Sequence, residues 1–182
     1  MSETDATKAG LERIRAVAMD VDGVLTDGGL WWGPGGEEWK RFCFADIMGV
    51  SLARRAGLEL ALISGENSPL VDRYAEKMHI HHVVKGCRDK AAALRDFAAS
   101  IGISLSDICF FGDDINDIFA MEIAGFCACP SNAAAEILET VSANGFVAKA
   151  SGGCGAVREY IDAIFAARNV AARDIFQLRS PE

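Results

Sequence analysis

The feature that most constrains the fold of this chain is a series of short, wholly apolar runs. Each run is followed by a longer stretch of helical character. Four such runs are Ala16–Met19, Leu60–Ile63, Ile108–Phe111 and Phe126–Cys129. Continuous apolar runs of this length indicate strands buried on both faces, as in a parallel sheet covered by helices. Strands that alternate with helices form right-handed crossover units. The sequence therefore predicts an α/β fold with a doubly wound parallel sheet.

The segments between these runs predict the covering helices and one further strand. We expect the chain before about Glu12 and after about Asp174 to form frayed or flexible ends. The expected helices are about Ile47–Ala56, Pro69–Met78, Asp89–Ile101, Ile115–Ala124, Ala133–Thr140 and Ala156–Ala167, and the further strand is His82–Lys85.

Residues 27–44 interrupt this alternation. Two runs, Gly28–Trp32 and Glu38–Phe42, flank a Gly/Pro turn, which is typical of a β-hairpin inserted after the first strand. A small hairpin cannot bury three indole rings by itself. The rings therefore pack either on their own domain or in a subunit interface. They belong to Trp31, Trp32 and Trp39.

Length, charge and composition limit the number of domains, the partners and the location that we expect for this chain. The 182 residues suit a single domain, 1–182, in which residues 151–182 form a C-terminal tail and helix. The net charge of −8 disfavours nucleic acid and anionic membranes as partners. The chain has no apolar run near the ~18 residues of a membrane span and no apolar leader, so we expect a cytoplasmic protein. Its six scattered cysteines form no CxxC pair and are expected to be reduced thiols.

Acidic residues gather where two of the expected strands end. Asp20 and Asp22 follow the first apolar run, and Asp113 and Asp117 follow the run at Ile108–Phe111. Ligands of doubly wound sheets bind beyond this edge. At an effective dielectric constant of about 20, two such charges 4 Å apart repel by about 4 kcal/mol. A hard divalent cation such as Mg2+ relieves that repulsion, with Asp113 as a ligand and Asp117 as a ligand or its support.

The same spacing separates chemical roles. Asp20 ends a buried strand, so its rigid position suits a nucleophile held in line with a phosphorus atom. Asp22 lies two residues later in a loop, where it could donate a proton to a leaving group and later accept one from water. Phosphate also needs donors, which Ser64 and the amides after it supply. Lys90, at a helix start, adds a positive charge.

These residues resemble the four motifs of the haloacid dehalogenase superfamily. The resemblance runs from about Ala16 to Ala167. A fifth stretch, GGCGAVRE at Gly152–Glu159, is similar to the C-terminal signature of small phosphatases of the 3-deoxy-octulosonate 8-phosphate type. The four motifs are DVDGVLTDG at Asp20–Gly28, ISG at Ile63–Gly65, Lys90, and GDDIND at Gly112–Asp117.

The resemblance implies a Mg2+-dependent phosphatase. Asp20 is then the nucleophile that forms an aspartyl-phosphate, and Asp22 is the acid/base. Mg2+ is bound by Asp20, the backbone carbonyl of Asp22, and Asp113. Ser64 and Lys90 hold the phosphoryl group.

The resemblance also implies an architecture. The similar phosphatases have a hairpin in place of a cap domain and form homotetramers in which a neighbour helps close the active site. Ser151–Gly155 resembles the segment that covers a neighbour's pocket, and Asp46 matches a position in the substrate pocket. We therefore expect a homotetramer that acts on a small phosphorylated sugar acid.

Two departures from the family pattern bear on the substrate. Octulosonate phosphatases typically carry arginine at the positions of Glu66 and Ser51. Glu66 together with Lys77 instead resembles phosphatases of 2-keto-3-deoxy-nononate 9-phosphate. Arg73 and Lys77 lie four residues apart on one helix face, either leaning toward the pocket or forming a solvated basic stripe beside Glu76. We expect the nine-carbon acid, with the eight-carbon acid as the alternative.

Other functions fit less well. A non-catalytic phosphoacceptor would not need the acid/base Asp22, and a purely structural tetramer would not need all four motifs intact. The chain has no GxSxG and no P-loop, which disfavours a serine hydrolase and a P-loop enzyme. Similar domains occur with acylneuraminate cytidylyltransferases, but this chain has no separate nucleotidyltransferase domain. The sequence assigns no role to Asp114 or Asn116.

Overall fold

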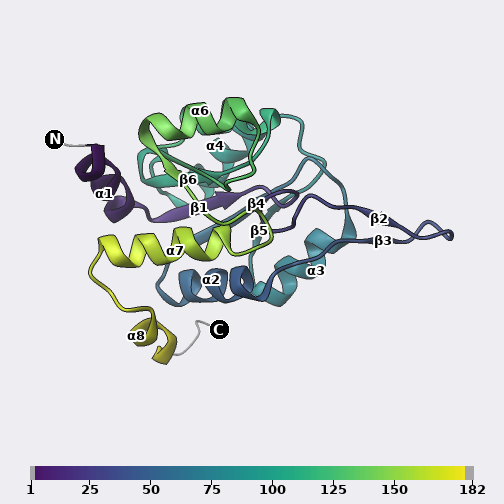
Figure 1. Ribbon diagram of the computed structural model, residues 1–182, viewed down its shortest axis with the longest axis horizontal. Helices are drawn as coiled ribbons and strands as arrows, with labels where there is room; N and C mark the ends of the chain where they lie inside the picture. The colour runs from purple at the N-terminus through teal and green to yellow at the C-terminus, as the bar shows by residue number, and fades with distance from the viewer. Residues whose placement is uncertain (1–2, 179–182) are drawn as a thin grey trace.

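The apolar runs become neighbouring strands of one parallel sheet in the computed structural model, which describes residues 3–178 (Figure 1). The order across the sheet is β5-β4-β1-β6-β7-β8. The first strand is central because β4 and β6 pair with its two sides. The strands are β1 (Ala16–Met19), β4 (Glu59–Ile63), β5 (His82–Val84), β6 (Ile108–Phe111), β7 (Phe126–Cys129) and β8 (Phe146–Val147).

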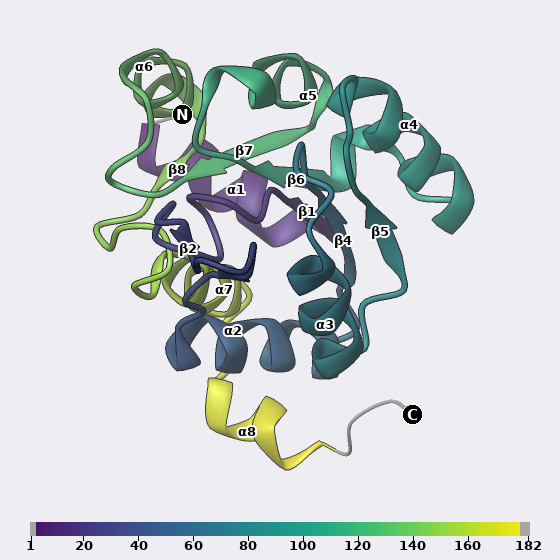
Figure 2. The same ribbon diagram turned by 90° about the vertical axis from the view of Figure 1, so that its right-hand side faces the viewer.

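Helices cover both faces of this sheet. Figure 2 shows α4, α5 and α6 on one side and α2, α3 and α7 on the other. Alternate residues of β1 enter the two cores, since Val17 and Met19 pack with α7 and Ala16 and Ala18 pack with α4. The predicted doubly wound α/β fold is confirmed. The helices are α1 (Glu3–Arg13), α2 (Phe44–Arg55), α3 (Pro69–Met78), α4 (Lys90–Ile101), α5 (Ile118–Ile123), α6 (Ala135–Asn144), α7 (Ala156–Ala167) and α8 (Ala172–Gln177), with short 3-10 turns at η1 (Leu105–Asp107) and η2 (Ile115–Asp117).

The two ends of the chain differ from expectation. The segment before Glu12 forms α1, and Leu11 packs into the core on the α7 side. Near the other end, α8 docks on α2, because the Arg55 guanidinium donates hydrogen bonds to the backbone carbonyls of Phe176 and Leu178. The expectation of frayed ends is therefore wrong for these helices. Residues 1–2 and 179–182 of the expected ends lie outside the described residues.

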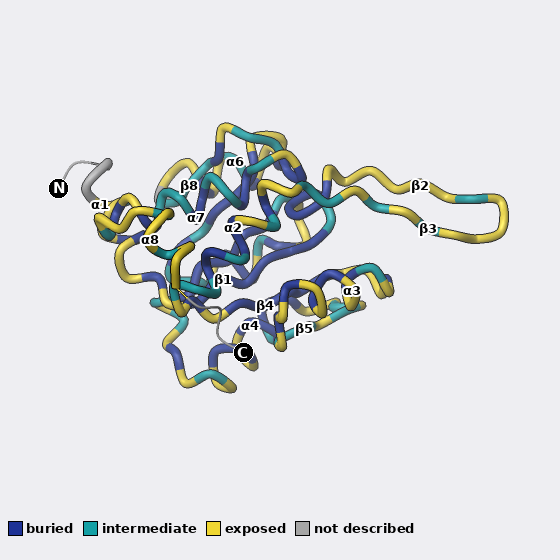
Figure 3. Tube along the Cα trace, turned by 90° about the horizontal axis from the view of Figure 1, so that it is seen from below, coloured by how far each residue is buried: buried dark blue, intermediate teal, exposed yellow. Residues whose placement is uncertain are grey.

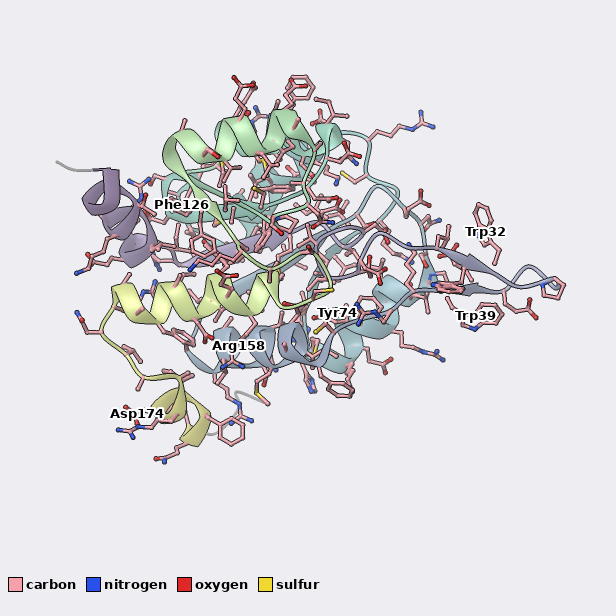
Figure 4. All side chains as sticks on the ribbon, viewed as in Figure 1. Trp32, Trp39, Tyr74, Phe126, Arg158 and Asp174 are labelled. Carbon is pink, nitrogen blue, oxygen red and sulfur yellow. The ribbon has the colours of Figure 1, made fainter. Side chains whose placement is uncertain are left out.

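The segment 27–44 projects from the domain as two short antiparallel strands, β2 (Trp31–Trp32) and β3 (Glu38–Trp39) (Figures 1 and 3). Trp31 lies opposite Trp39 in the ladder. The three tryptophans are 69%, 75% and 52% exposed in chain order, and the labelled rings of Trp32 and Trp39 lie out on the hairpin in Figure 4. Packing of these rings on their own domain is therefore excluded in the single chain.

Asp46 has a structural task that its sequence position did not reveal. It is buried in the first turn of α2, where its two oxygens accept hydrogen bonds from the backbone N–H groups of Gly155 and Arg158, both at 3.0 Å. These amides belong to the start of α7, whose first N–H groups have no partner within the helix. Asp46 therefore caps α7, a structural role that the sequence analysis did not predict, and its match to a substrate-pocket position stays a prediction.

Within residues 3–178, no helix combines the length and the apolar character that crossing a membrane requires. The longest described helices have 12 residues, whereas a span needs about 20.

Candidate active site

The acidic residues predicted to meet do so at the carboxyl edge of β1 and β6. Met19 and Phe111 are register partners, so the residues that follow them leave the sheet side by side. The N–H of Asp20 donates to the Phe111 carbonyl at 2.9 Å, which continues the ladder past the strand ends. A cavity of about 190 Å³ opens there, and its lining residues are Asp20, Asp22, Gly65, Glu66, Asp113, Asp114 and Asn116.

Asp20 is held by two contacts. The Val21 N–H donates to its Oδ1 at 2.7 Å, and the Lys90 Nζ lies 2.9 Å from its Oδ2. Burial raises the pKa of Asp20 to about 6. The charge of Asp117 raises this pKa further, and the charge of Lys90 lowers it but only partly offsets burial. The carboxylate is therefore fixed in position and costly to keep charged.

Lys90 is the first residue of α4, which Asp89 caps by accepting a hydrogen bond from the Ala92 N–H at 2.8 Å. The Lys90 side chain is only 1% exposed and bridges Asp20 and Asp117. Burial lowers the pKa of Lys90, but the two carboxylates outweigh burial and raise that pKa above its usual value. The sequence-based expectation of a positive charge at this edge agrees with the geometry.

Asp117 is fully buried and has little capacity left for a metal ion. Its Oδ1 accepts a hydrogen bond from Lys90 Nζ at 2.6 Å, and its Oδ2 accepts from the N–H groups of Asp113 and Asp114. A Cβ on Gly112 would lie 2.5 Å from the Asp117 Cγ, so glycine allows the close approach. Of the two roles left open by the sequence, these contacts favour support over direct ligation.

At this edge of the sheet, two buried carboxylate oxygens have no hydrogen-bond partner among the described residues, namely Asp113 Oδ1 and Asp22 Oδ2. Burial raises the pKa of Asp113 to about 8, and the charges of Asp20, Asp117 and Asp114 contribute to that rise. One oxygen each from Asp20, Asp113 and Asp117 lies within 4.8 Å of the other two. Carboxylate oxygens at this spacing, together with the unpartnered Asp113 Oδ1, fit a hard cation such as Mg2+.

The turn after β1 brings Asp113 close to the backbone. Gly23 adopts φ +86°, and a Cβ there would lie 2.0 Å from the Asp113 Oδ2. Any other residue at this position would displace the carboxylate, so glycine is required for conformation and for space.

The end of β4 supplies the hydroxyl expected at the site. Ser64 is fully buried, and its Oγ accepts a hydrogen bond from the Glu66 N–H at 3.1 Å. The Ser64 backbone N–H donates to the Val84 carbonyl at 2.8 Å, which ties the loop to β5. Gly65 and Glu66 line the cavity, whereas the buried Ser64 is not among its lining residues.

Lys40 is a site residue that the sequence analysis missed. Its side chain is only 3% exposed, and its Nζ lies 2.7 Å from the Asp22 Oδ1 and 3.7 Å from a Glu38 oxygen. The lysine sits in the run Glu37–Arg41, where charged residues surround Trp39. Nothing in that pattern distinguishes it from a solvated hairpin lysine, and only the folded path of the hairpin reveals its partner.

Two further groups of expected site residues do not line this cavity in the single chain. Arg73 and Lys77 lie on the exposed side of α3, and the residues that line the cavity do not include them. The segment Ser151–Gly155 packs against its own chain, where a Cβ on Gly152 would lie 1.7 Å from the Gly23 carbonyl oxygen. This segment therefore packs closely on the turn after β1, and its expected contact with a neighbouring subunit's pocket stays a prediction.

Comparisons with known proteins point to one family. A family model of haloacid dehalogenase-like hydrolases matches residues 60–150. The 3-deoxy-D-manno-octulosonate 8-phosphate phosphatase KdsC of Escherichia coli K12 is 32% identical over 160 residues, which cover 88% of this chain and 84% of that protein.

Two solved structures are similar over nearly the whole chain. A Legionella pneumophila protein described as a HAD superfamily (subfamily III A) hydrolase has a TM-score of 0.91 and 32% identity, with 97% of each chain covered. The 3-deoxy-D-manno-octulosonate 8-phosphate phosphatase of Moraxella catarrhalis, in complex with magnesium, phosphate and KDO, has a TM-score of 0.85 and 34% identity. That match covers 91% of this chain and 93% of the other.

The raised carboxyl pKa values predict how pH affects stability. The folded pKa values of Asp20 (about 6) and Asp113 (about 8) exceed the usual 3.8, so between these values the folded protein binds more protons than the unfolded chain. Stability of the metal-free protein should fall as pH rises from about 4 to about 8. Mg2+ replaces these protons, so it should raise Tm more at pH 8 than at pH 5.

Thermal unfolding in EDTA and in Mg2+ tests this prediction. Asp113→Asn should weaken both the pH dependence and the Mg2+ effect, while Asp72→Asn, an exposed carboxyl on α3, serves as the matched control. A Tm increase by Mg2+ that is equal at both pH values in the wild type would contradict the assignment.

Proposed function

The chain belongs to the haloacid dehalogenase-like hydrolases and is a phosphomonoester hydrolase, and from that premise we propose that it is a Mg2+-dependent phosphatase of a phosphorylated 2-keto-3-deoxy sugar acid. One observation carries the proposal. Two carboxylates, Asp20 and Asp22, line one small cavity, the first fixed by Lys90 and the second with a free buried oxygen.

In the proposed reaction, a carboxylate oxygen of Asp20 attacks the phosphorus atom and the ester P–O bond breaks. Asp22 gives its proton to the departing alkoxide, which leaves as the alcohol of the sugar acid. A water molecule then attacks the aspartyl-phosphate and passes a proton to Asp22. The Asp20 carboxylate is released with inorganic phosphate, and both residues return to their starting states.

Positive groups offset the charge that gathers during transfer. Lys90 and the donors around Ser64 would contact the phosphoryl oxygens. The residues proposed to hold Mg2+ are Asp20, Asp113 and the backbone carbonyl of Asp22, with Asp117 orienting the loop that carries Asp113. When bound, the ion neutralises carboxylate and phosphate charge.

Substitution of the two aspartates tests the assignment. Asp20→Asn should abolish turnover of an aryl phosphate, and Asp22→Asn should slow it by about 10²- to 10⁴-fold, the usual contribution of an acid/base group. EDTA should remove the activity and Mg2+ restore it. Asp72→Asn, on the exposed side of α3, is the control that keeps the wild-type rate. Near-normal turnover by Asp20→Asn, or activity that survives EDTA, refutes the mechanism.

The cavity is smaller than the substrate. Its volume of about 190 Å³ is below the ~300–1,000 Å³ typical of sites that enclose a whole small ligand. The cavity therefore suits the phosphoryl end, and the sugar acid would extend past its rim. The exposed rim residues include Glu66, Asp114 and Asn116.

Two sugar acids compete as the substrate. Glu66 on the rim favours the nine-carbon nononate 9-phosphate, by its resemblance to those phosphatases. The similarity to octulosonate 8-phosphate phosphatases favours the eight-carbon acid. Arg73 and Lys77 would contribute only if another subunit presented them, so in one chain the nine-carbon proposal depends on Glu66.

A kinetic comparison of the two acids separates these candidates. We expect the wild type to prefer the nine-carbon ester, and Glu66→Arg should shift the ratio of kcat/KM values toward the eight-carbon ester. Glu76→Arg makes the same charge change on the exposed side of α3 and should leave the ratio unchanged. An identical ratio in wild type and Glu66→Arg would remove Glu66 from the specificity determinants.

We also propose a homotetramer assembled through the hairpin. Its three exposed indole rings form an apolar surface on a projecting element, which monomeric proteins seldom leave uncovered. The acidic cavity lies near the base of this hairpin, since Lys40 follows β3 and contacts Asp22. Association would therefore bring a second chain close to the cavity rim.

Removal of two indoles tests the assembly. Sedimentation velocity should give a tetramer for the wild type and a smaller species for the double variant Trp31→Ser, Trp32→Ser, with Tm of the chain largely retained. Phe119→Ser removes a comparably exposed ring from α5 and should leave the tetramer intact. A monomeric wild type, or a tetramer that survives the double variant, contradicts the proposal.

A further inference from the structure

Lys40 is unusual because a cation on a projecting hairpin is withdrawn from solvent. Its neighbours Trp39 and Arg41 are exposed, yet the Lys40 side chain is only 3% exposed. Burial of an ammonium group costs solvation and rotamer entropy that an exposed ion pair does not. A specific contact must offset that cost, and the contact is the 2.7 Å pair with the Asp22 Oδ1.

A second carboxylate, that of Glu38, also contacts Lys40. Glu38 lies 3.7 Å from the Lys40 Nζ and also accepts a hydrogen bond from the Ser68 Oγ at 2.9 Å. Ser68 is the N-cap of α3, where its Oγ accepts a hydrogen bond from the Leu70 N–H. A continuous series of polar contacts therefore runs from a rigid helix end, through β3, to Asp22.

The ion pair with Lys40 makes the two carboxylate oxygens of Asp22 different from each other. Lys40 occupies Oδ1, whereas Oδ2 is buried and has no hydrogen-bond partner among the described residues. We propose that Lys40 is a positioning residue for phosphoryl transfer, which holds Asp22 through Oδ1 and leaves Oδ2 as the oxygen that exchanges the proton. The inference rests on the proposed phosphatase function and adds a residue to it.

The proton then follows one defined path. Oδ2 gives its proton to the ester oxygen as the P–O bond breaks, and it takes a proton from water when water attacks the aspartyl-phosphate. Without Lys40, the Asp22 carboxylate is free to rotate and either oxygen can turn away from the leaving group. Loss of orientation slows proton transfer without removing the acid itself.

Lys40→Met tests the inference because it keeps the length of the apolar stem and removes the charge. With whichever of the two sugar-acid phosphates the wild type hydrolyses faster, kcat should fall about 10- to 100-fold, with a small change in KM. Arg41→Met is the matched control, because Arg41 neighbours Lys40 but pairs with Asp27 at the hairpin base. It should retain kcat within about twofold.

Substrates with different leaving groups distinguish a loss of Asp22 orientation from a general disruption of the active site. The p-nitrophenolate ion leaves with little help from an acid, whereas a sugar alkoxide needs a proton. In single-turnover experiments, Lys40→Met should therefore slow phosphate transfer from the sugar-acid ester much more than transfer from p-nitrophenyl phosphate. An equal loss on both substrates would overturn the inference.

A double-mutant cycle gives an independent readout. If Lys40 acts through Asp22, Lys40→Met should cause almost no further loss in an Asp22→Asn background. Multiplicative losses would assign Lys40 a separate, structural role. Lys40→Arg, which keeps a donor and a charge, should recover part of the rate that Lys40→Met loses.

The remaining outcomes are also decisive. If Lys40→Met fails to fold, Glu38→Gln replaces it, because loosening the anchor of Lys40 should cause a smaller loss with the same leaving-group dependence. A wild type that hydrolyses no phosphate ester defeats the proposed function and this inference with it. A wild type that depends on Asp22 but whose Lys40 variants show no leaving-group dependence defeats this inference alone.

Discussion

Repulsion among buried carboxylates at the ends of β1 and β6 is the constraint on which the rest of the site depends. One oxygen each of Asp20, Asp113 and Asp117 lies within 4.8 Å of the other two, and burial strengthens every charge interaction between them. Lys90 compensates two of these residues directly. Burial, with the neighbouring carboxylate charges added to it, raises the pKa of Asp113 to about 8, and a divalent cation is favourable at such a carboxyl group.

The hairpin connects this charged edge to the outside of the molecule. One end carries the exposed indole rings, and the other carries Lys40 with its contact to Asp22. The loop around Gly23 is tightly packed from both sides, by Asp113 and by Gly152. The hairpin and the close-packed turn around Gly23 therefore both constrain Asp22, the carboxylate proposed as acid/base. The orientation of Asp22 thus depends on packing away from the phosphoryl group.

Prediction from the sequence succeeded where local pattern decides structure. The apolar runs gave the strands, and α3 and α7 begin and end where expected. It failed at α1, whose polar surface hides the few apolar residues that dock it, and at the two-residue strand β8, which is too short to show a period. The cap role of Asp46 was not predicted, because an acid at a helix start looks the same in the sequence whether it binds substrate or caps another helix.

The sequence by itself determined that Asp20 and Asp113 would meet, because residues that follow neighbouring parallel strands leave the sheet at one edge. Only the tertiary structure decided which of their oxygens are occupied. Lys90 reaches Asp117 across 27 residues, Gly155 reaches Asp46 across 109, and Lys40 reaches Asp22 through the hairpin. Spacing along the chain fixes where a side chain begins, but hydrogen-bond partners depend on how separate elements pack in space.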